Sequence, residues 1–172
     1  REERVMKLVF ANEKEKSLGS KNEKVVMLCG PTPRSPWVKS WRPEAIKLFQ
    51  QLSPVNGGPD VLLIPEHSSW TPQCDDYYYQ IDWEHRALVR ADVIMFWIPR
   101  DLCSMPGLTT NVEFGSWMNS GKVILGFPPE AAKMSYMAWH ARQLEIPMAS
   151  TLVETVQKTI AFLDSIDPLE KL

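Results

Sequence analysis

The chain has 172 residues, 44% of them hydrophobic, which is enough for one domain with a full core and too few for two ordinary domains. The formal net charge is −2, and acidic and basic residues are spread along the whole sequence. This charge pattern excludes the basic surface with which nucleic-acid-binding proteins neutralise phosphate backbones, so we expect a small-molecule ligand and no nucleic acid polymer.

No apolar stretch approaches the roughly 20 residues that a membrane span requires, and the first four residues do not resemble a secretory signal. The three cysteines, Cys29, Cys74 and Cys103, lack the spacing of metal ligands. Their odd number does not indicate a disulfide framework. We therefore expect a cytoplasmic protein with reduced thiols, no membrane association, and neither a metal nor another cofactor.

The chain divides into two parts by composition. Residues 1–24 form a charged leader with a short apolar run, Val5 to Ala11, and a polar linker, Ser17 to Lys24. Residues 25–172 form a single α/β domain, because short apolar runs alternate there with amphipathic helical patterns.

The apolar runs show no alternation with polar residues, as expected of strands buried on both faces of a parallel sheet. They are Val25–Cys29, Val61–Ile64, Val93–Ile98 and Val123–Phe127, with a weaker fifth candidate at Ile146–Ser150. The helical patterns between them are Trp41–Leu52, Tyr77–Leu88, Phe114–Met118, Ala131–Leu144 and Thr151–Leu163, the last opened by a capping box, Thr151 to Glu154. This order predicts a doubly wound parallel sheet of four to five strands with helices on both faces.

Glu113 is a candidate nucleophile. It follows the third long apolar strand, and a carboxylate there lies at the carboxyl edge of the sheet, where open α/β folds bind ligands. The four residues Thr110 to Glu113 also match a capping box, which gives Glu113 an ordinary structural role. The two roles are compatible, because the start of a helix favours an ionised carboxylate.

Glu84 is a second candidate, because its spacing from Tyr77, Ile81 and Leu88 places it on the apolar stripe of its helix. A carboxylate on that stripe needs a partner or a function. The structural alternative is a partly buried ion pair with a nearby arginine such as Arg34 or Arg100.

The loop after the first strand of the domain offers groups for substrate binding. Gly30 and Pro31 begin it, and Gly30 lets a ligand approach the backbone. Thr32 supplies a hydroxyl, and Arg34 supplies a forked donor suited to phosphate or carboxylate. The loop matches neither a phosphate-binding P-loop nor a dinucleotide fingerprint, so its position at the end of a strand is its main support.

Two further side chains could contact a nucleoside. Trp83 belongs to a cluster of aromatic residues that could stack on a planar base, although most of that cluster is expected in the core or at an interface. Asn111 could hydrogen-bond a sugar hydroxyl or only cap the helix.

Several segments together resemble the nucleoside 2-deoxyribosyltransferase family, in particular its divergent deoxyribosyltransferase-like branch. The segments, in chain order, are Met27–Arg34, Trp83–Glu84, Ala91–Pro99, Asn111–Gly115 and Gly121–Lys122, within a similarity that runs from about Val25 to Leu163. Each segment is loosely defined alone, and their order and spacing carry the resemblance.

The resemblance implies a flavodoxin-like fold and a retaining attack on the glycosidic carbon of a nucleoside. Glu113 matches the family nucleophile in the motif Glu-hydrophobic-Gly, and Glu84, eight residues before Asp92, matches the family acid, which is usually Asp. Related 5′-nucleotide N-glycosidases hold a phosphate with the first-strand loop, a role that suits Thr32 and Arg34. The transferases complete their sites with the C-terminal tail of a neighbouring subunit, which residues 164–172 do not match. A homo-oligomer is expected instead from the surplus of Trp, Tyr and Met, which favours a self-association surface.

Three functions follow as hypotheses. The first is a deoxyribosyltransferase, a pentosyltransferase that exchanges bases through a glycosyl-Glu113 intermediate. The second is an N-glycosidase acting on nucleosides or their 5′-monophosphates. The third is a catalytically silent nucleotide-sensing domain.

Overall fold

The computed structural model describes residues 5–55, 57–70 and 76–166, and Cys74 and the last six residues lie outside this range. Within these described residues, a parallel sheet of six strands has the order β1-β3-β2-β4-β5-β6. The strands are Lys7–Phe10 (β1), Val25–Cys29 (β2), Val61–Ile64 (β3), Val93–Trp97 (β4), Val123–Gly126 (β5) and Met148–Ala149 (β6). The predicted doubly wound, flavodoxin-like α/β fold is confirmed.

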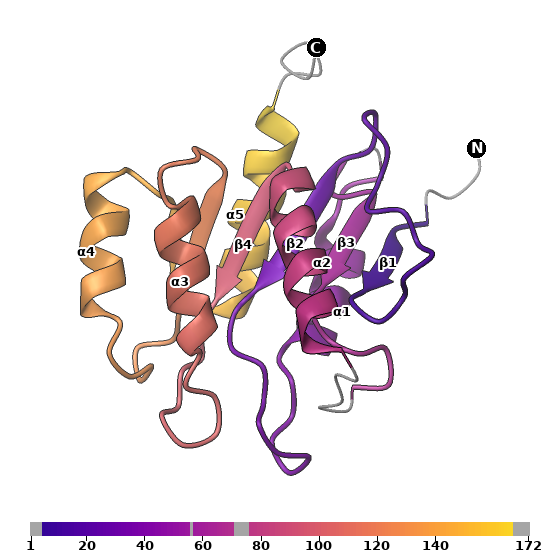
Figure 1. Cartoon of the computed structure of the whole chain (residues 1–172). Helices are drawn as coiled ribbons and strands as arrows, with labels where there is room; N and C mark the ends of the chain where they lie inside the picture. The colour runs from indigo at the N-terminus through magenta and orange to yellow at the C-terminus, as the bar shows by residue number, and fades with distance from the viewer. Residues whose placement is uncertain (1–4, 56, 71–75, 167–172) are drawn as a thin grey trace.

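The part of the chain that the structure describes contains five helices. They cover the two faces of the sheet (Figure 1). They are Arg42–Leu52 (α1), Tyr77–Arg90 (α2), Leu108–Trp117 (α3), Ser135–Gln143 (α4) and Leu152–Ser165 (α5). Helices α2, α3 and α4 pack on one face, and α1 and α5 pack on the other. Among the described residues, no helix is long and apolar enough to cross a membrane.

The unbroken apolar runs of the central strands are explained by these two helical layers. In β2, Val25, Met27 and Cys29 face the layer of α2, α3 and α4, whereas Val26 and Leu28 face α1 and α5. All five side chains are buried, because successive residues of a strand point to opposite faces and both faces are covered here. A strand of this kind has no solvent face on which a polar residue could lie.

The part of the sheet that the structure describes has six strands and not the predicted four to five, because the apolar run of the leader and the weak fifth candidate both form strands. The apolar run of the leader supplies β1, which pairs with β3 in parallel register from Lys7 opposite Val61 to Phe10 opposite Ile64. The region of the fifth candidate supplies β6, a strand of two residues on β5. Its edge position explains the weak signal, because both of its residues are only partly buried.

The two predicted capping boxes have different outcomes. At the start of α5, the Thr151 hydroxyl accepts a hydrogen bond from the backbone N–H of Glu154 at 3.1 Å, so this cap is confirmed. The box at Thr110 is wrong, because α3 begins at Leu108, after Gly107 in the left-handed conformation at φ 62°. Thr110 therefore lies inside the helix, and Glu113 lies in its second turn.

The predicted apolar stripe of α2 is also wrong in part. Tyr77 and Ile81 are 60% and 45% exposed, and the helix buries Trp83, Ala87 and Leu88 instead. Tyr77 and Ile81 are therefore exposed to solvent and do not belong to the packed face of this helix. Glu84 comes directly after Trp83 and is half-buried at the border of the packed face.

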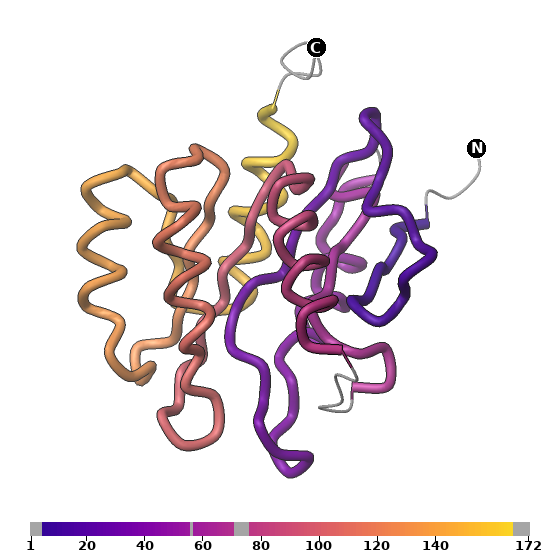
Figure 2. Tube along the Cα trace, in the orientation of Figure 1, coloured from indigo at the N-terminus to yellow at the C-terminus, as the bar shows by residue number. Residues whose placement is uncertain are grey.

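The strand order reverses between β2 and β4, because β3 lies on one side of β2 and β4 lies on the other. Loops that follow the strands on either side of such a point separate, which leaves a crevice at the carboxyl edge of the sheet. Figure 2 shows the β2–α1 loop and the β4–α3 loop projecting from the same edge. These two loops bring the predicted site residues together.

Gly126 gives a test of the packing of α5 on the sheet. A Cβ atom at this position would lie 2.0 Å from Oγ1 of Thr155, a fully buried residue of α5, so the helix would have to move. We expect Gly126→Ala to lower the free energy of unfolding by about 1–3 kcal/mol, measured by urea denaturation.

Gly115 is the matched control, because a Cβ atom there would meet nothing within 4 Å. Gly115→Ala places alanine inside α3 and should raise the free energy of unfolding by roughly 0.5–1 kcal/mol. Equal effects of the two substitutions would contradict the packing described here.

Candidate functional site

A cavity of about 190 Å³ opens at the reversal of strand order. Its walls come from the β2–α1 loop, from α2 and from the first two turns of α3. Glu84 on α2 and Glu113 on α3 both line it. Two carboxyl groups from different helices therefore face one small volume.

Glu84 is held by its own helix. Gln80, one turn earlier on α2, donates a hydrogen bond from Nε2 to Oε1 of Glu84 at 2.8 Å, and the same Nε2 lies 3.4 Å from the carbonyl oxygen of Pro65. The ion pair with Arg34 or Arg100 that was considered for Glu84 does not form. The carboxyl of Glu84 is thus oriented by a neutral amide.

Both carboxyl groups are protonated more readily than usual. Burial, followed by the charge of Glu84, raises the pKa of Glu113 to about 8, and the positive charge of Arg42 opposes this increase. Burial also raises the pKa of Glu84, against the hydrogen bond from Gln80 and the charge of Arg42. The expectation that the start of α3 keeps Glu113 ionised is therefore wrong, because desolvation and the neighbouring carboxylate outweigh the helix dipole.

Arg42 is the buried cation of the site and was not predicted from the sequence. Its residue exposure is 0%, and it lines the cavity together with both glutamates. It forms an ion pair with Glu66 at 2.5 Å and donates to the Thr32 hydroxyl at 3.1 Å. A fully buried arginine with these partners fixes the β2–α1 loop against α1.

Most of the predicted site residues meet at this cavity. Gly30, Pro31, Thr32 and Arg34 line it, in addition to Glu84 and Glu113. In this way the loop after β2 contributes one wall, as its position at the end of a strand suggested.

Trp83 and Asn111 do not line the cavity. Trp83 is 1% exposed and packs in the core between α2 and the sheet, and its Nε1 has no hydrogen-bond partner among the described residues. The side-chain oxygen of Asn111 accepts a hydrogen bond from the buried guanidinium of Arg100. Both side chains therefore support the helices that carry the two glutamates.

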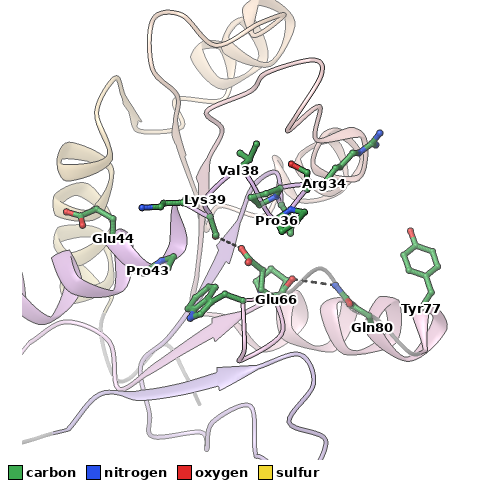
Figure 3. A pocket seen from close by; sticks show the side chains of 15 residues that line it. Arg34, Pro36, Val38, Lys39, Pro43, Glu44, Glu66, Tyr77 and Gln80 are labelled. Carbon is green, nitrogen blue, oxygen red and sulfur yellow. Dashed lines mark hydrogen bonds between the residues drawn. The ribbon is translucent and has the colours of Figure 1, made fainter.

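A larger groove of about 950 Å³ continues from the cavity, and the two share Thr32, Arg34, Pro65, Tyr77 and Gln80. Figure 3 shows Glu66 near the middle of this groove, with Arg34 and Lys39 extending towards opposite sides. Its floor is tied together by hydrogen bonds from Ser40 to Glu66 at 2.5 Å and from Gln80 to Pro65. The site can thus accommodate a ligand that extends beyond the two glutamates.

Sequence patterns contained a signal for Arg42 but none for its partner. Arg42 lies three, four and seven residues before Ala45, Ile46 and Phe49, which are all buried, so it shares the inner face of α1. Glu66 follows β3 at the carboxyl edge of the sheet, and only the fold brings it to Arg42.

A family model described as nucleoside 2-deoxyribosyltransferase like matches residues 23–131, which include the β2–α1 loop, Glu84 and Glu113. No curated protein matches the sequence. The matched segment is more than half of the chain, and it contains both carboxyl groups of the cavity. On these grounds the chain belongs to the nucleoside 2-deoxyribosyltransferase-like family, as its sequence motifs predicted.

Proposed function

We propose that this protein cleaves the N-glycosidic bond of a nucleoside or nucleotide by a retaining double displacement. This proposal rests on one observation: Glu84 and Glu113, both half-buried, line the same cavity. Retaining glycosyl chemistry uses two carboxyl groups on either side of the scissile bond, one as nucleophile and one as acid.

In the first step, the carboxylate of Glu113 attacks C1′ and forms a glycosyl ester while the bond from C1′ to the base breaks. The departing nitrogen takes the electron pair of that bond and receives a proton from Glu84. In the second step, an acceptor base or water attacks C1′, releases Glu113, and returns a proton to Glu84. An acceptor base gives a transferase, and water gives a hydrolase.

The electrostatics of the cavity keep one proton on the pair of carboxyls. Because the charge of Glu84 helps to raise the pKa of Glu113 to about 8, this proton resides on Glu113 in the free protein, and the proposed reaction requires it to move to Glu84. Two carboxyl groups in a desolvated space resist double ionisation, so the pair retains one proton over a range of pH. One proton on two carboxyls is the state in which one group can donate and the other can attack. The positive charge that develops at C1′ favours the form with Glu113 ionised.

Glu113→Gln should abolish turnover. Glutamine keeps the size of the side chain and loses the nucleophilic oxygen, so we expect activity to fall by at least about 10³-fold. The assay incubates the protein with deoxynucleosides and 5′-monophosphates, with and without a second base, and follows free base and exchanged nucleoside by chromatography.

Glu15→Gln is the matched control, because Glu15 is exposed and lies in the β1–β2 loop, outside the cavity. Unchanged activity in Glu113→Gln would exclude this nucleophile. If the parent protein binds nucleotides without converting any of them, the nucleotide-sensing hypothesis replaces the enzyme.

The same substitution has a predicted effect on stability that requires no substrate. The pKa of Glu113 is raised from 4.5 to about 8 in the folded protein, so its proton stabilises the fold fully below pH 4.5 and this contribution is lost as the pH rises to about 8. We expect Glu113→Gln to be more stable than the parent protein at pH 8 by roughly 1–3 kcal/mol, and the difference to shrink towards pH 5. Urea denaturation at pH 5, 6.5 and 8 measures it, and a gap that does not change with pH would contradict the buried, protonated state.

A nucleoside 5′-monophosphate N-glycosidase is the second candidate, and the state of Arg34 favours it. Arg34 is exposed at the junction of cavity and groove, and its guanidinium forms no ion pair with any described residue. Thr32 lines the same junction, so a phosphate there would meet a forked cation and a hydroxyl.

If Arg34 holds a phosphate, Arg34→Ala should raise KM for 5′-monophosphates by about 10- to 100-fold and leave KM for nucleosides unchanged. Lys47→Ala is the control, since Lys47 is an exposed cation on α1 that lines neither the cavity nor the groove. An equal rise in KM for nucleosides and for 5′-monophosphates would argue against a phosphate site.

We also propose a homo-oligomer, which would complete the open side of the groove. Its support is the set of exposed aromatic side chains on α2 and α4, namely Tyr77, Tyr78, Tyr136 and Trp139. The cytoplasmic location expected from the sequence stays a prediction.

A further inference from the structure

The guanidinium of Arg42, at the start of α1, donates hydrogen bonds to four different groups. Its Nε donates to the carbonyl oxygen of Leu28 at 3.1 Å and its Nη2 donates to that of Gly30 at 2.8 Å, both at the end of β2. Its Nη1 donates to the Thr32 hydroxyl and to Glu66. The guanidinium is therefore fixed in place by the strand end, the loop and a carboxylate, without contact with bulk water.

The charge of this fixed group acts on the cavity. Arg42 lines the cavity that contains Glu84 and Glu113, and it favours the ionised form of both carboxyls. The other titratable or charged groups that face Glu113 are Arg34 and Tyr77 on the cavity wall and the buried thiol of Cys29. Arg34 is exposed, so solvent screens its charge more strongly than that of Arg42.

Glu66 controls how much of this positive charge is available. It does not line the small cavity, and its Oε1 accepts hydrogen bonds from Nη1 of Arg42 and from the hydroxyl of Ser40. A carboxylate in this position cancels part of the field of Arg42 at Glu113. Of the two charges, only that of Arg42 belongs to the wall of the cavity.

We propose that Arg42 and Glu66 are positioning residues of the site, in which the fixed guanidinium balances the negative charge of Glu113 when its proton is absent and Glu66 sets the strength of that balance. In the proposed reaction, Arg42 therefore keeps part of the Glu113 population ionised, which is the form that attacks C1′. The inference rests on the proposed role of Glu113. Its test uses a readout that does not depend on turnover.

The test is a titration of Glu113 by NMR, with ¹³C-labelled glutamate and with Glu113→Gln to assign the signal. The titration midpoint of Glu113 should fall by on the order of one pH unit in Glu66→Gln, because the charge of Arg42 is no longer cancelled. It should rise by a similar amount in Arg42→Gln. A purely structural role for the pair predicts loss of stability without these opposite shifts.

Removing one member of a buried ion pair leaves an uncompensated charge inside the protein, which can prevent a single variant from folding. The double variant Arg42→Gln/Glu66→Gln leaves no unpaired buried charge and keeps the test possible. Its midpoint should lie above that of the parent protein, because Arg42 and not Glu66 lines the cavity.

Glu15→Gln removes one exposed carboxylate outside the cavity and should leave the midpoint unchanged. Shifts of the same sign in both single variants, or an unchanged midpoint in the double variant, would overturn the proposal. If the opposite shifts occur and the parent protein shows no turnover, the electrostatic role of the pair stands and the proposed reaction fails.

Discussion

The presence of two carboxyl groups in one desolvated cavity is the constraint on which the rest of the site depends. Glu84 and Glu113 cannot both be ionised there without cost, because water screens neither charge well. The surrounding groups limit this cost in different ways: Gln80 binds one carboxyl through a neutral amide, and Arg42 supplies a fixed positive charge. The protein can therefore remain folded while the two carboxyl groups together hold one proton.

The topology of the sheet makes this approach possible. Glu84 is carried by the helix before β4 and Glu113 by the helix after it, and both helices cover the same face of the sheet. The reversal of strand order between β2 and β4 adds the β2–α1 loop as the third wall. Arg42 then ties this loop to α1 on the opposite face, so the site is connected to both helical layers of the fold.

Much of the fold was predictable because a strand that is buried on both faces is an unbroken apolar run in the sequence. The four central strands are unbroken apolar runs, and the position of Glu113 at the carboxyl edge followed from its place after such a run. Glu84 was identified from the spacing within α2, although part of the predicted apolar stripe of that helix is exposed. The start of α3 was mispredicted because Thr110 resembles a cap, whereas the left-handed conformation of Gly107 permits an earlier start. Local pattern alone does not distinguish these two starts.

The electrostatic state of the site was not predictable for a different reason. Helix position favours an ionised Glu113, but the dominant influences are burial and the charge of Glu84, which depend on tertiary packing. Similarly, the spacing within α1 places Arg42 on the inner face, while its pairing with Glu66 requires β3 to lie beside β2. In α1, periodicity thus identifies Arg42 as a side chain that turns inward, and only the fold decides what it contacts.

The most direct test of the account is to trap the intermediate. A 2′-fluorinated deoxynucleoside slows the loss of the sugar from the nucleophile, because fluorine destabilises the positive charge at C1′ in the transition state. Mass spectrometry of peptides from the treated protein should then find the fluorinated sugar attached to Glu113 and not to Glu84. Attachment to another residue, or release of base with an inverted sugar product and no adduct, would contradict the account.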